Sequence, residues 1–172
     1  MDYLTEVAMR VLKQFPDWKW LVVGSGEEQA FLQRFILKNK MEHQLILTGR
    51  TQDVNAYLRK AQIYVMTSRI EGLGMSLLEA KSFSLPSVSF DIPTGPNEII
   101  EDGVNGYLVE PFDCEDMAEK LARLMEDDAL RADFAAHAQD NAEKFQMQGI
   151  LRDWNYVLDH GNQFWQSGTK EL

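Results

Sequence analysis

Two acidic residues, Glu71 and Glu79, stand on either side of a turn that contains two glycines, with seven residues between them. The apolar run at 63–66 predicts a strand before this turn, and the residues from Met75 onward favour a helix after it. Free N–H groups at the start of a helix attract anions, and glycine lets a ligand approach the backbone closely. We therefore expect backbone amides here to bind phosphate. These amides belong to Gly72, Leu73, Gly74, Met75 and Ser76.

The two carboxylates suit a different part of the ligand, because carboxylate oxygens accept hydrogen bonds strongly from hydroxyl groups. Glu79 would lie about one turn inside the helix on the face of Met75, so that it points back toward the turn. Acids at comparable places in dinucleotide folds bind ribose hydroxyls, and we predict this role for Glu79. A solvent-exposed helix glutamate is the alternative. Amides for phosphate and acids for hydroxyls together indicate a nucleotide-sugar site.

Strands and helices alternate along the chain around this site. Strands are predicted at 18–23, 44–47, 63–66, 87–90 and 106–109. Helices are predicted at 3–15, 27–38, 54–60, 75–83, 97–101, 114–126, 129–143 and 149–160. This order specifies an α/β, Rossmann-like, doubly wound parallel sheet with helices on both faces, which binds ligands beyond the carboxyl ends of its strands. We divide it into a nucleotide-sugar-binding core at 1–112 and C-terminal helices at 113–172 that complete the same domain.

The charge balance and the cysteine content exclude several classes of partner. The 172 residues carry a formal net charge of -10, which argues against nucleic acid or an anionic membrane surface as a bulk partner. Cys114 is the only cysteine, so the chain has no internal disulfide and suits a reducing compartment. No apolar run reaches the roughly 20 residues that span a bilayer. We expect a soluble, cytoplasmic protein.

No residue pattern predicts a metal site. The histidines His43, His137 and His160 have neither metal-ligand nor catalytic-triad spacing, and we assign them to the surface or to packing. The acids between 110 and 119 are typical of a solvated helix start. Aromatic residues near the C-terminus predict either an interface or ordinary core packing. They are Trp154, Tyr156, Phe164 and Trp165.

Four ordered motifs carry a resemblance to a known family. The segments 71–80, 23–27, 95–100 and 103–109 read Glu-Gly-Leu-Gly-Met-Ser-Leu-Leu-Glu-Ala, Val-Gly-Ser-Gly-Glu, Gly-Pro-Asn-Glu-Ile-Ile and Gly-Val-Asn-Gly-Tyr-Leu-Val. With these motifs the chain resembles, up to about Leu124, the retaining glycosyltransferases of family four, which have the GT-B fold. The resemblance is to their C-terminal, donor-binding domain.

The resemblance implies a role for each part of the site. Glu71 would contact the transferred sugar and stabilise charge near its anomeric carbon, without acting as a nucleophile. Arg50 and Thr51 would lie near the base or the phosphates, with a plain surface arginine as the alternative for Arg50. The loop at 24–26 would face the cleft without binding the diphosphate, and 95–98 would form the cleft rim. A UDP-sugar is the expected donor, and the family implies no cofactor and no bound cation.

The resemblance also implies parts that this chain lacks. Family members have two domains, and the N-terminal one binds the acceptor, a glycan or a lipid, and could hold the protein at the inner membrane face. Their second domain opens with a central strand that ends in Gly-Arg, and nothing before Tyr3 matches it. We therefore expect the isolated chain to be inactive as an enzyme. Its sheet should be rearranged, or completed by intermolecular strand pairing.

Three functions stay open at this point. The first is the donor-binding domain of a retaining hexosyltransferase, which moves a hexose from a nucleoside diphosphate to a glycan or lipid acceptor. The second is a non-catalytic nucleotide-sugar-binding or regulatory module, which the missing basic strand favours. The third is a sugar-nucleotide epimerase of the same fold, which would need a catalytic histidine at a strand end.

Overall fold

The computed structural model describes residues 2–140 and 142–167, with the backbone alone at 143 and 161–167. Contacts divide the chain into two compact units, Met1–Gln139 and Asp140–Leu172. The predicted grouping, a core at 1–112 that helices at 113–172 complete as one domain, stays a prediction. The segment 113–139, which the sequence grouped with the C-terminal helices, belongs to the first unit.

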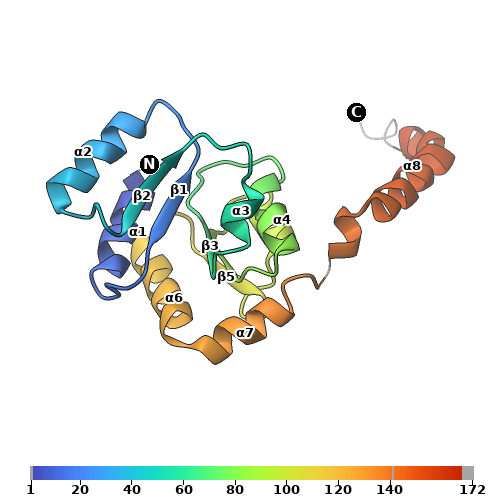
Figure 1. Ribbon diagram of the computed structural model, residues 1–172. Helices are drawn as coiled ribbons and strands as arrows, with labels where there is room; N and C mark the ends of the chain where they lie inside the picture. Colours follow the sequence, from blue (N-terminus) through green and yellow to red (C-terminus); the bar gives the residue numbers. More distant parts are fainter. Residues whose placement is uncertain (1, 141, 168–172) are drawn as a thin grey trace. The chain divides into compact units, whose positions relative to one another are not determined.

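Short parallel strands form two sheet pieces in the first unit (Figure 1). The strands are β1 (Trp20–Val23), β2 (Leu45–Gly49), β3 (Tyr64–Met66), β4 (Ser87–Phe90) and β5 (Gly106–Val109). β1 pairs with β2, and β3, β4 and β5 pair in that order. Within the described residues no strand joins β1 to β3. The predicted Rossmann-like α/β fold is confirmed, and its parallel sheet is interrupted between β1 and β3.

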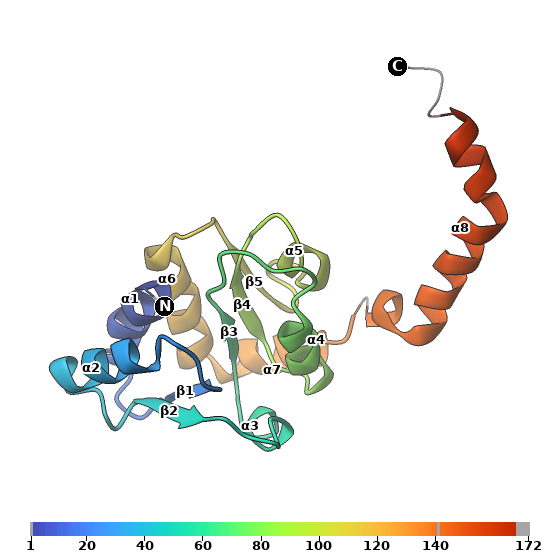
Figure 2. The same ribbon diagram turned by 90° about the horizontal axis from the view of Figure 1, so that it is seen from above.

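Helices lie on both faces of the three-stranded piece. The helices are α1 (Asp2–Leu12), α2 (Gln29–Asn39), α3 (Asn55–Leu58), α4 (Met75–Ser82), α5 (Pro96–Ile99), α6 (Cys114–Glu126), α7 (Asp128–Ala136) and α8 (Met147–Ser167), with a 3-10 turn η1 at Ala142–Phe145. Figure 2 shows α1 and α6 on one side of β3, β4 and β5, and α4 on the other. α1 packs on α6, and α6 packs on β4 and β5.

Apolar residues of these elements form one main core. Leu12 of α1, Phe90 of β4 and Leu121 of α6 are each at most 2% exposed, and they belong to one cluster. Fully burying a side chain of this size contributes about 1.5–3 kcal/mol. The core therefore fixes the direction of β3, β4 and β5, whose carboxyl ends carry the loops of interest.

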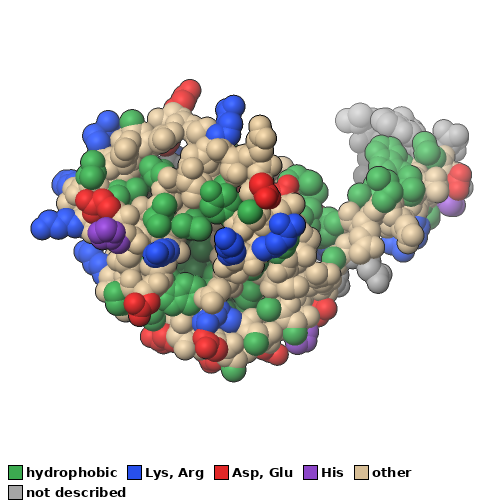
Figure 3. All heavy atoms as spheres, in the orientation of Figure 1, with side chains coloured by type: hydrophobic (Ala, Val, Ile, Leu, Met, Phe, Trp, Pro, Cys, Tyr) green, Lys and Arg blue, Asp and Glu red, His purple; other side chains and the backbone are tan. Residues whose placement is uncertain are grey.

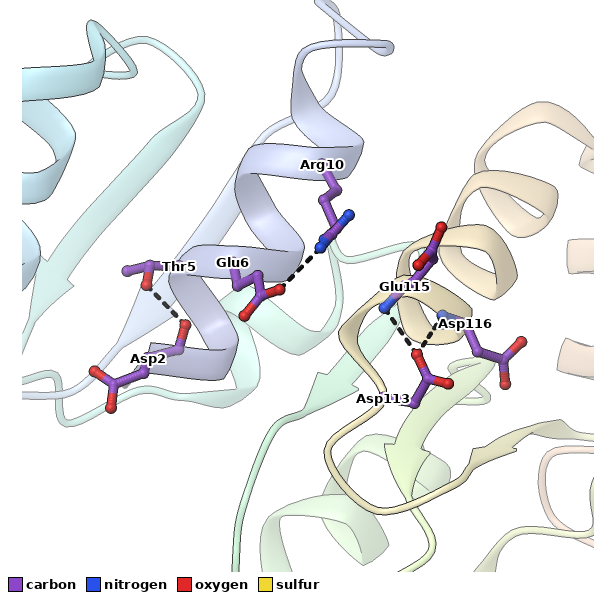
Figure 4. A network of polar contacts seen from close by, with 7 residues as sticks. All are labelled: Asp2, Thr5, Glu6, Arg10, Asp113, Glu115 and Asp116. Carbon is purple, nitrogen blue, oxygen red and sulfur yellow. Dashed lines mark hydrogen bonds and ion pairs between the residues drawn. The ribbon is translucent and has the colours of Figure 1, made fainter.

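The start of α6 is fixed by a hydrogen-bonded cap beside α1 (Figure 4). Asp113 Oδ1 accepts hydrogen bonds from the main-chain N–H groups of Glu115 and Asp116, each at 3.0 Å. On α1, Arg10 forms a 2.9 Å ion pair with Glu6. A capping aspartate stabilises a helix by about 1 kcal/mol, and acids in the first turn favour the helix dipole. The acidic run at 110–119 is thus a helix start, as predicted.

The bounds of three predicted helices are wrong by more than two residues. The helix predicted at 3–15 ends at Leu12, because Pro16 disfavours helical backbone at the residue before it. The helix predicted at 129–143 ends at Ala136, where the chain turns and buries Ala138, which is 0% exposed. α8 begins at Met147 and continues past residue 160 to Ser167.

α8 in the second unit carries apolar side chains at helical spacing. Ile150, Trp154 and Val157 are 41%, 61% and 50% exposed. Tyr156 is also exposed within this unit, whereas the side chains of Phe164 and Trp165 lie outside the described residues. An interface remains the prediction for this stripe. Over the described residues, no helix combines the length and the hydropathy needed to cross a membrane.

Candidate functional site

The junction between β3 and α4 has the geometry of an anion site. Gly74 precedes Met75, the first residue of α4, with a φ of 78°, a left-handed conformation that glycine adopts without steric cost. The Gly74 carbonyl accepts hydrogen bonds from the N–H groups of Leu77 at 2.9 Å and Leu78 at 3.2 Å. No side chain caps this helix start. The amides of Met75 and Ser76 are therefore the donors that a ligand would meet.

Glu71 lies in the loop before α4 and is half-buried. Ser68 Oγ donates a hydrogen bond to Glu71 Oε1 at 2.6 Å. Thr94 Oγ1, from the loop after β4, donates to the main-chain oxygen of Glu71 at 2.5 Å. Both the side chain and the backbone of Glu71 are thus held by hydroxyl groups. A carboxylate can accept several hydrogen bonds, so Glu71 keeps capacity for a ligand hydroxyl.

Glu79 is exposed on α4, one turn after Ser76 on the same face. The phenol of Tyr64, at the start of β3, donates to Ser76 Oγ at 2.8 Å. Burial raises the pKa of Tyr64, and the negative charges of Glu71 and Glu79 also raise it, against the lowering effect of the Ser76 hydrogen bond.

Sequence reasoning missed Tyr64, Ser68 and Thr94 as members of this group. Tyr64 is the one polar side chain in the run at 63–66, and a half-buried phenol needs a partner. Ser68 stands three residues before Glu71, a spacing at which serine often bonds locally. These two signals were present in the sequence. Thr94 comes from another strand-end loop, and no local spacing connects it with Glu71.

Arg50 and Thr51 follow β2, away from these contacts. Arg50 is exposed, and Thr51 Oγ1 accepts a hydrogen bond from the N–H of Asp53 at 3.0 Å. The N–H of Gly24 donates to the Gly49 oxygen at 3.0 Å, which joins the loops after β1 and β2. In the part of the chain that the structure describes, no hydrogen bond or ion pair connects Arg50 or Thr51 with the loop before α4. Their place near the base or the phosphates stays a prediction.

The face drawn in Figure 3 is hollowed between β1 and β3. Hydrophobic side chains line this hollow, and Lys and Arg side chains border it. Leu21 and Val23 of β1 are 42% and 36% exposed, which is unusual for a strand of apolar residues.

Ion pairs do not neutralise the two acids. Among the described residues, no Lys or Arg pairs with Glu71 or Glu79. Arg69 of the same loop turns toward α1 instead, where it lies 3.4 Å from Asp2 and 5.1 Å from the centre of the Tyr3 ring. Within 2–140 and 142–167, no group of three or more His, Cys, Asp or Glu side chains could hold a metal ion.

Fold and site together define the class of this protein. A parallel α/β structure with an uncapped helix start after β3 is a Rossmann-like domain. The chain belongs to the family of glycosyl transferases group 1, which matches residues 1–141. Solved relatives of the chain are glycosyltransferases with the GT-B fold.

Three relatives illustrate the match. The amylovoran biosynthesis glycosyltransferase AmsD of Erwinia amylovora is 38% identical over 156 residues, which cover 91% of this chain and 43% of AmsD. A Staphylococcus aureus TarM variant, crystallised in complex with fondaparinux, alpha-GlcNAc-glycerol and UDP, matches with a TM-score of 0.86 and 36% identity over 91% of this chain and 32% of TarM. The C-terminal domain of LpcC from Francisella tularensis, a glycosyl transferase group 1 family protein, matches with a TM-score of 0.74 and 30% identity over 84% of this chain and 78% of that domain.

The chain therefore spans less than half the length of AmsD and of TarM.

Proposed function

We propose that the chain is the C-terminal, donor-binding domain of a retaining glycosyltransferase that moves a hexose from a UDP-sugar to a glycan or lipid acceptor. Membership of glycosyl transferases group 1 supports transfer of a sugar. The LpcC structure, of which the chain covers 78%, is described as a C-terminal domain. The UDP in the TarM complex supports a uridine donor, and its alpha-GlcNAc-glycerol is an alpha-linked compound, which suits retention.

The observation that carries the proposal is the placement of two acids around one open helix start. The amides from Gly72 to Ser76 would bind the diphosphate. Glu79, which is exposed and unpaired by any described cation, would accept hydrogen bonds from the ribose hydroxyls. Glu71, held by Ser68, would bind the transferred sugar. The two acids would thus grip the two ends of one nucleotide sugar.

The transfer would follow a front-face route. The bond between the anomeric carbon and the phosphate oxygen breaks, and a bond from the acceptor hydroxyl oxygen to that carbon forms on the same face. The acceptor proton passes to the leaving diphosphate, so that charge and atoms balance. Backbone amides at the helix start stabilise the negative charge that develops on the diphosphate. Glu71 positions the sugar and stabilises positive charge at the anomeric carbon.

The histidines do not favour an epimerase. His43 lies between α2 and β2, His137 ends α7, and His160 lies in α8, so none belongs to a loop at the carboxyl end of a strand. A catalytic histidine for epimerase chemistry is thus missing from the described strand-end loops.

We further propose that the whole protein completes the interrupted sheet. An N-terminal acceptor-binding domain would account for length that AmsD and TarM have beyond this chain. The free edges of β1 and β3 would accept an extended segment from outside these residues, because open apolar edges favour pairing with another strand. The exposed stripe of α8, including Trp154 and Leu158, would pack on that second domain.

Calorimetric titration tests the donor proposal. UDP, GDP, ADP and their sugar conjugates are titrated into this chain and into its Glu79→Ala variant. We expect uridine compounds to bind best and Glu79→Ala to weaken UDP binding about tenfold or more, since it removes charge-assisted hydrogen bonds. Unchanged affinity in the variant would refute the ribose role of Glu79. UDP-sugar binding without sugar transfer by the whole protein would instead favour a regulatory module.

A further inference from the structure

The loop after β4 packs backbone to backbone on the loop that carries Glu71. Thr94 Oγ1 donates to the main-chain oxygen of Glu71 at 2.5 Å, across 23 residues of sequence. The Thr94 side chain is exposed, so its hydroxyl contributes little to the apolar core. Its described hydrogen bond goes to the backbone of the predicted sugar-binding acid.

Gly95 makes this approach sterically possible. It is buried and has a φ of 97°, which other residues rarely adopt. A Cβ atom at this position would lie 2.9 Å from the Leu73 oxygen, 3.0 Å from the Leu73 carbonyl carbon and 3.4 Å from the Gly74 nitrogen. Those atoms are backbone and cannot swing away. Only glycine therefore lets the two loops touch in this way.

The loop after β4 is itself anchored at both ends. β4 is buried along its whole length, and Ile92 just after it is 1% exposed. On the other side, the buried Lys81 of α4 donates from Nζ to the Ile99 oxygen of α5 at 2.6 Å. The segment from β4 to α5 is thus held at both ends, and Thr94 with Gly95 is where it meets the loop that carries Glu71.

We propose that Thr94 and Gly95 are positioning residues that hold Glu71 ready for the transferred sugar. A loop with two glycines would otherwise sample many backbone conformations, and binding would have to order it. Ser68 orients the Glu71 carboxylate, and Thr94 fixes the Glu71 backbone, so each hydroxyl restrains a different part of the residue. Preorganisation of this kind lowers the cost of binding.

This positioning role rests on the proposed function, but it concerns recognition of the sugar and not of the nucleotide. Glu79 is part of α4, whose own hydrogen bonds position it. The position of Glu71 depends on the hydrogen bond from Thr94 in the loop after β4. Loss of the Thr94 hydroxyl should therefore weaken recognition of the sugar while leaving recognition of the nucleotide nearly intact.

Matched variants of this chain test the claim. Thr94→Val removes the hydroxyl at nearly constant volume, Thr94→Ser keeps it, and Ser87→Ala removes a comparable hydroxyl-to-carbonyl bond, 3.1 Å to the Leu85 oxygen, at the opposite end of β4. The affinities for UDP and UDP-N-acetylglucosamine are measured by calorimetry. Hydrogen–deuterium exchange of residues 67–76 is measured without ligand.

Thr94→Val should lower the affinity for UDP-N-acetylglucosamine about threefold to tenfold, the usual worth of one hydrogen bond, and change that for UDP less than about twofold. It should also raise exchange at 67–76. Thr94→Ser should keep the affinities and the exchange of the unaltered chain. Ser87→Ala should change neither the ratio of the two affinities nor the exchange at 67–76.

Two results would overturn the inference. In one, Thr94→Val binds both ligands as tightly as the unaltered chain does; in the other, its affinity falls by the same factor for both ligands. If the unaltered chain binds neither ligand, the proposed function fails and the positioning role fails with it. Faster exchange in Thr94→Val would then assign Thr94 to loop stability alone.

Discussion

The Tyr64 hydroxyl donates a 2.8 Å hydrogen bond to Ser76 Oγ, and this bond joins β3 to the first turn of α4. Both carboxylates of the site, Glu71 and Glu79, act on the same phenol. The bond fixes α4, and with it the amides that face a ligand, relative to the strand.

A double-mutant cycle on Tyr64 and Ser76 should reveal this coupling. Tyr64→Phe and Ser76→Ala each remove one partner, and the double variant should be less destabilised than the sum of the two. We expect a coupling of about 0.5–1.5 kcal/mol in the free energy of unfolding, as for one hydrogen bond. Urea unfolding of the four proteins measures it, and strict additivity would show that the bond does not form in solution.

The pKa of Tyr64 predicts a loss of stability at alkaline pH. Its folded pKa is raised, first by burial, above the ordinary value of about 10. The folded state then holds the phenol proton more tightly than the unfolded state, so the free energy of unfolding falls as pH rises above about 10. Below that pH the contribution is fully present. Ultraviolet titration of the chain against Tyr64→Phe should show one tyrosine that ionises late, and identical curves would contradict the prediction.

Cys114 should be unreactive in the folded protein. Its side chain is 5% exposed, and burial, with the nearby Glu6, raises the pKa of the thiol to about 11. The thiolate that attacks disulfide reagents is therefore scarce at pH 8. Labelling with an aromatic disulfide reagent should be slow in buffer and fast in urea. Rapid labelling of the native chain would show that the start of α6 opens.

Because one edge of β1 is open, the same substitution in β1 should have different effects on the stability of this chain and of the whole protein. Leu21→Lys should change the free energy of unfolding of this chain by less than about 1 kcal/mol, because Leu21 is 42% exposed. Leu12→Ala, at a residue with 0% exposure, should cost about 2–5 kcal/mol and serves as the control.

In the whole protein a strand covering β1 would bury residue 21, and Leu21→Lys should then cost far more. Equal effects of Leu21→Lys in the two proteins would contradict the proposed strand pairing.

Local patterns in the sequence predict the elements that local interactions determine. β4 and α6 have the predicted bounds, because a continuous apolar run and a capping aspartate each act within a few residues. The helix predicted at 129–143 ends at Ala136, where the chain turns so that Ala138 is buried. Such a turn depends on the packing of the folded chain.

The same distinction applies to the candidate site. Spacing in the sequence made Glu71 and Glu79 candidates, because they lie on the two sides of one turn, and their roles stay a prediction. Thr94 reaches Glu71 only through the parallel pairing of β3 and β4, which brings the loops after them together. The interruption between β1 and β3 was expected from the resemblance, whereas the contacts of Tyr64 and Gly95 required coordinates.

The most direct test of the account compares Glu71→Gln and Glu79→Gln, each titrated with UDP and with UDP-N-acetylglucosamine. Because Glu79 is assigned to the ribose, Glu79→Gln should weaken both ligands by the same factor, about tenfold. Because Glu71 is assigned to the sugar, Glu71→Gln should weaken only UDP-N-acetylglucosamine. Equal losses in the two variants for both ligands, or no loss in either, would contradict the claim that the two acids hold opposite ends of one nucleotide sugar.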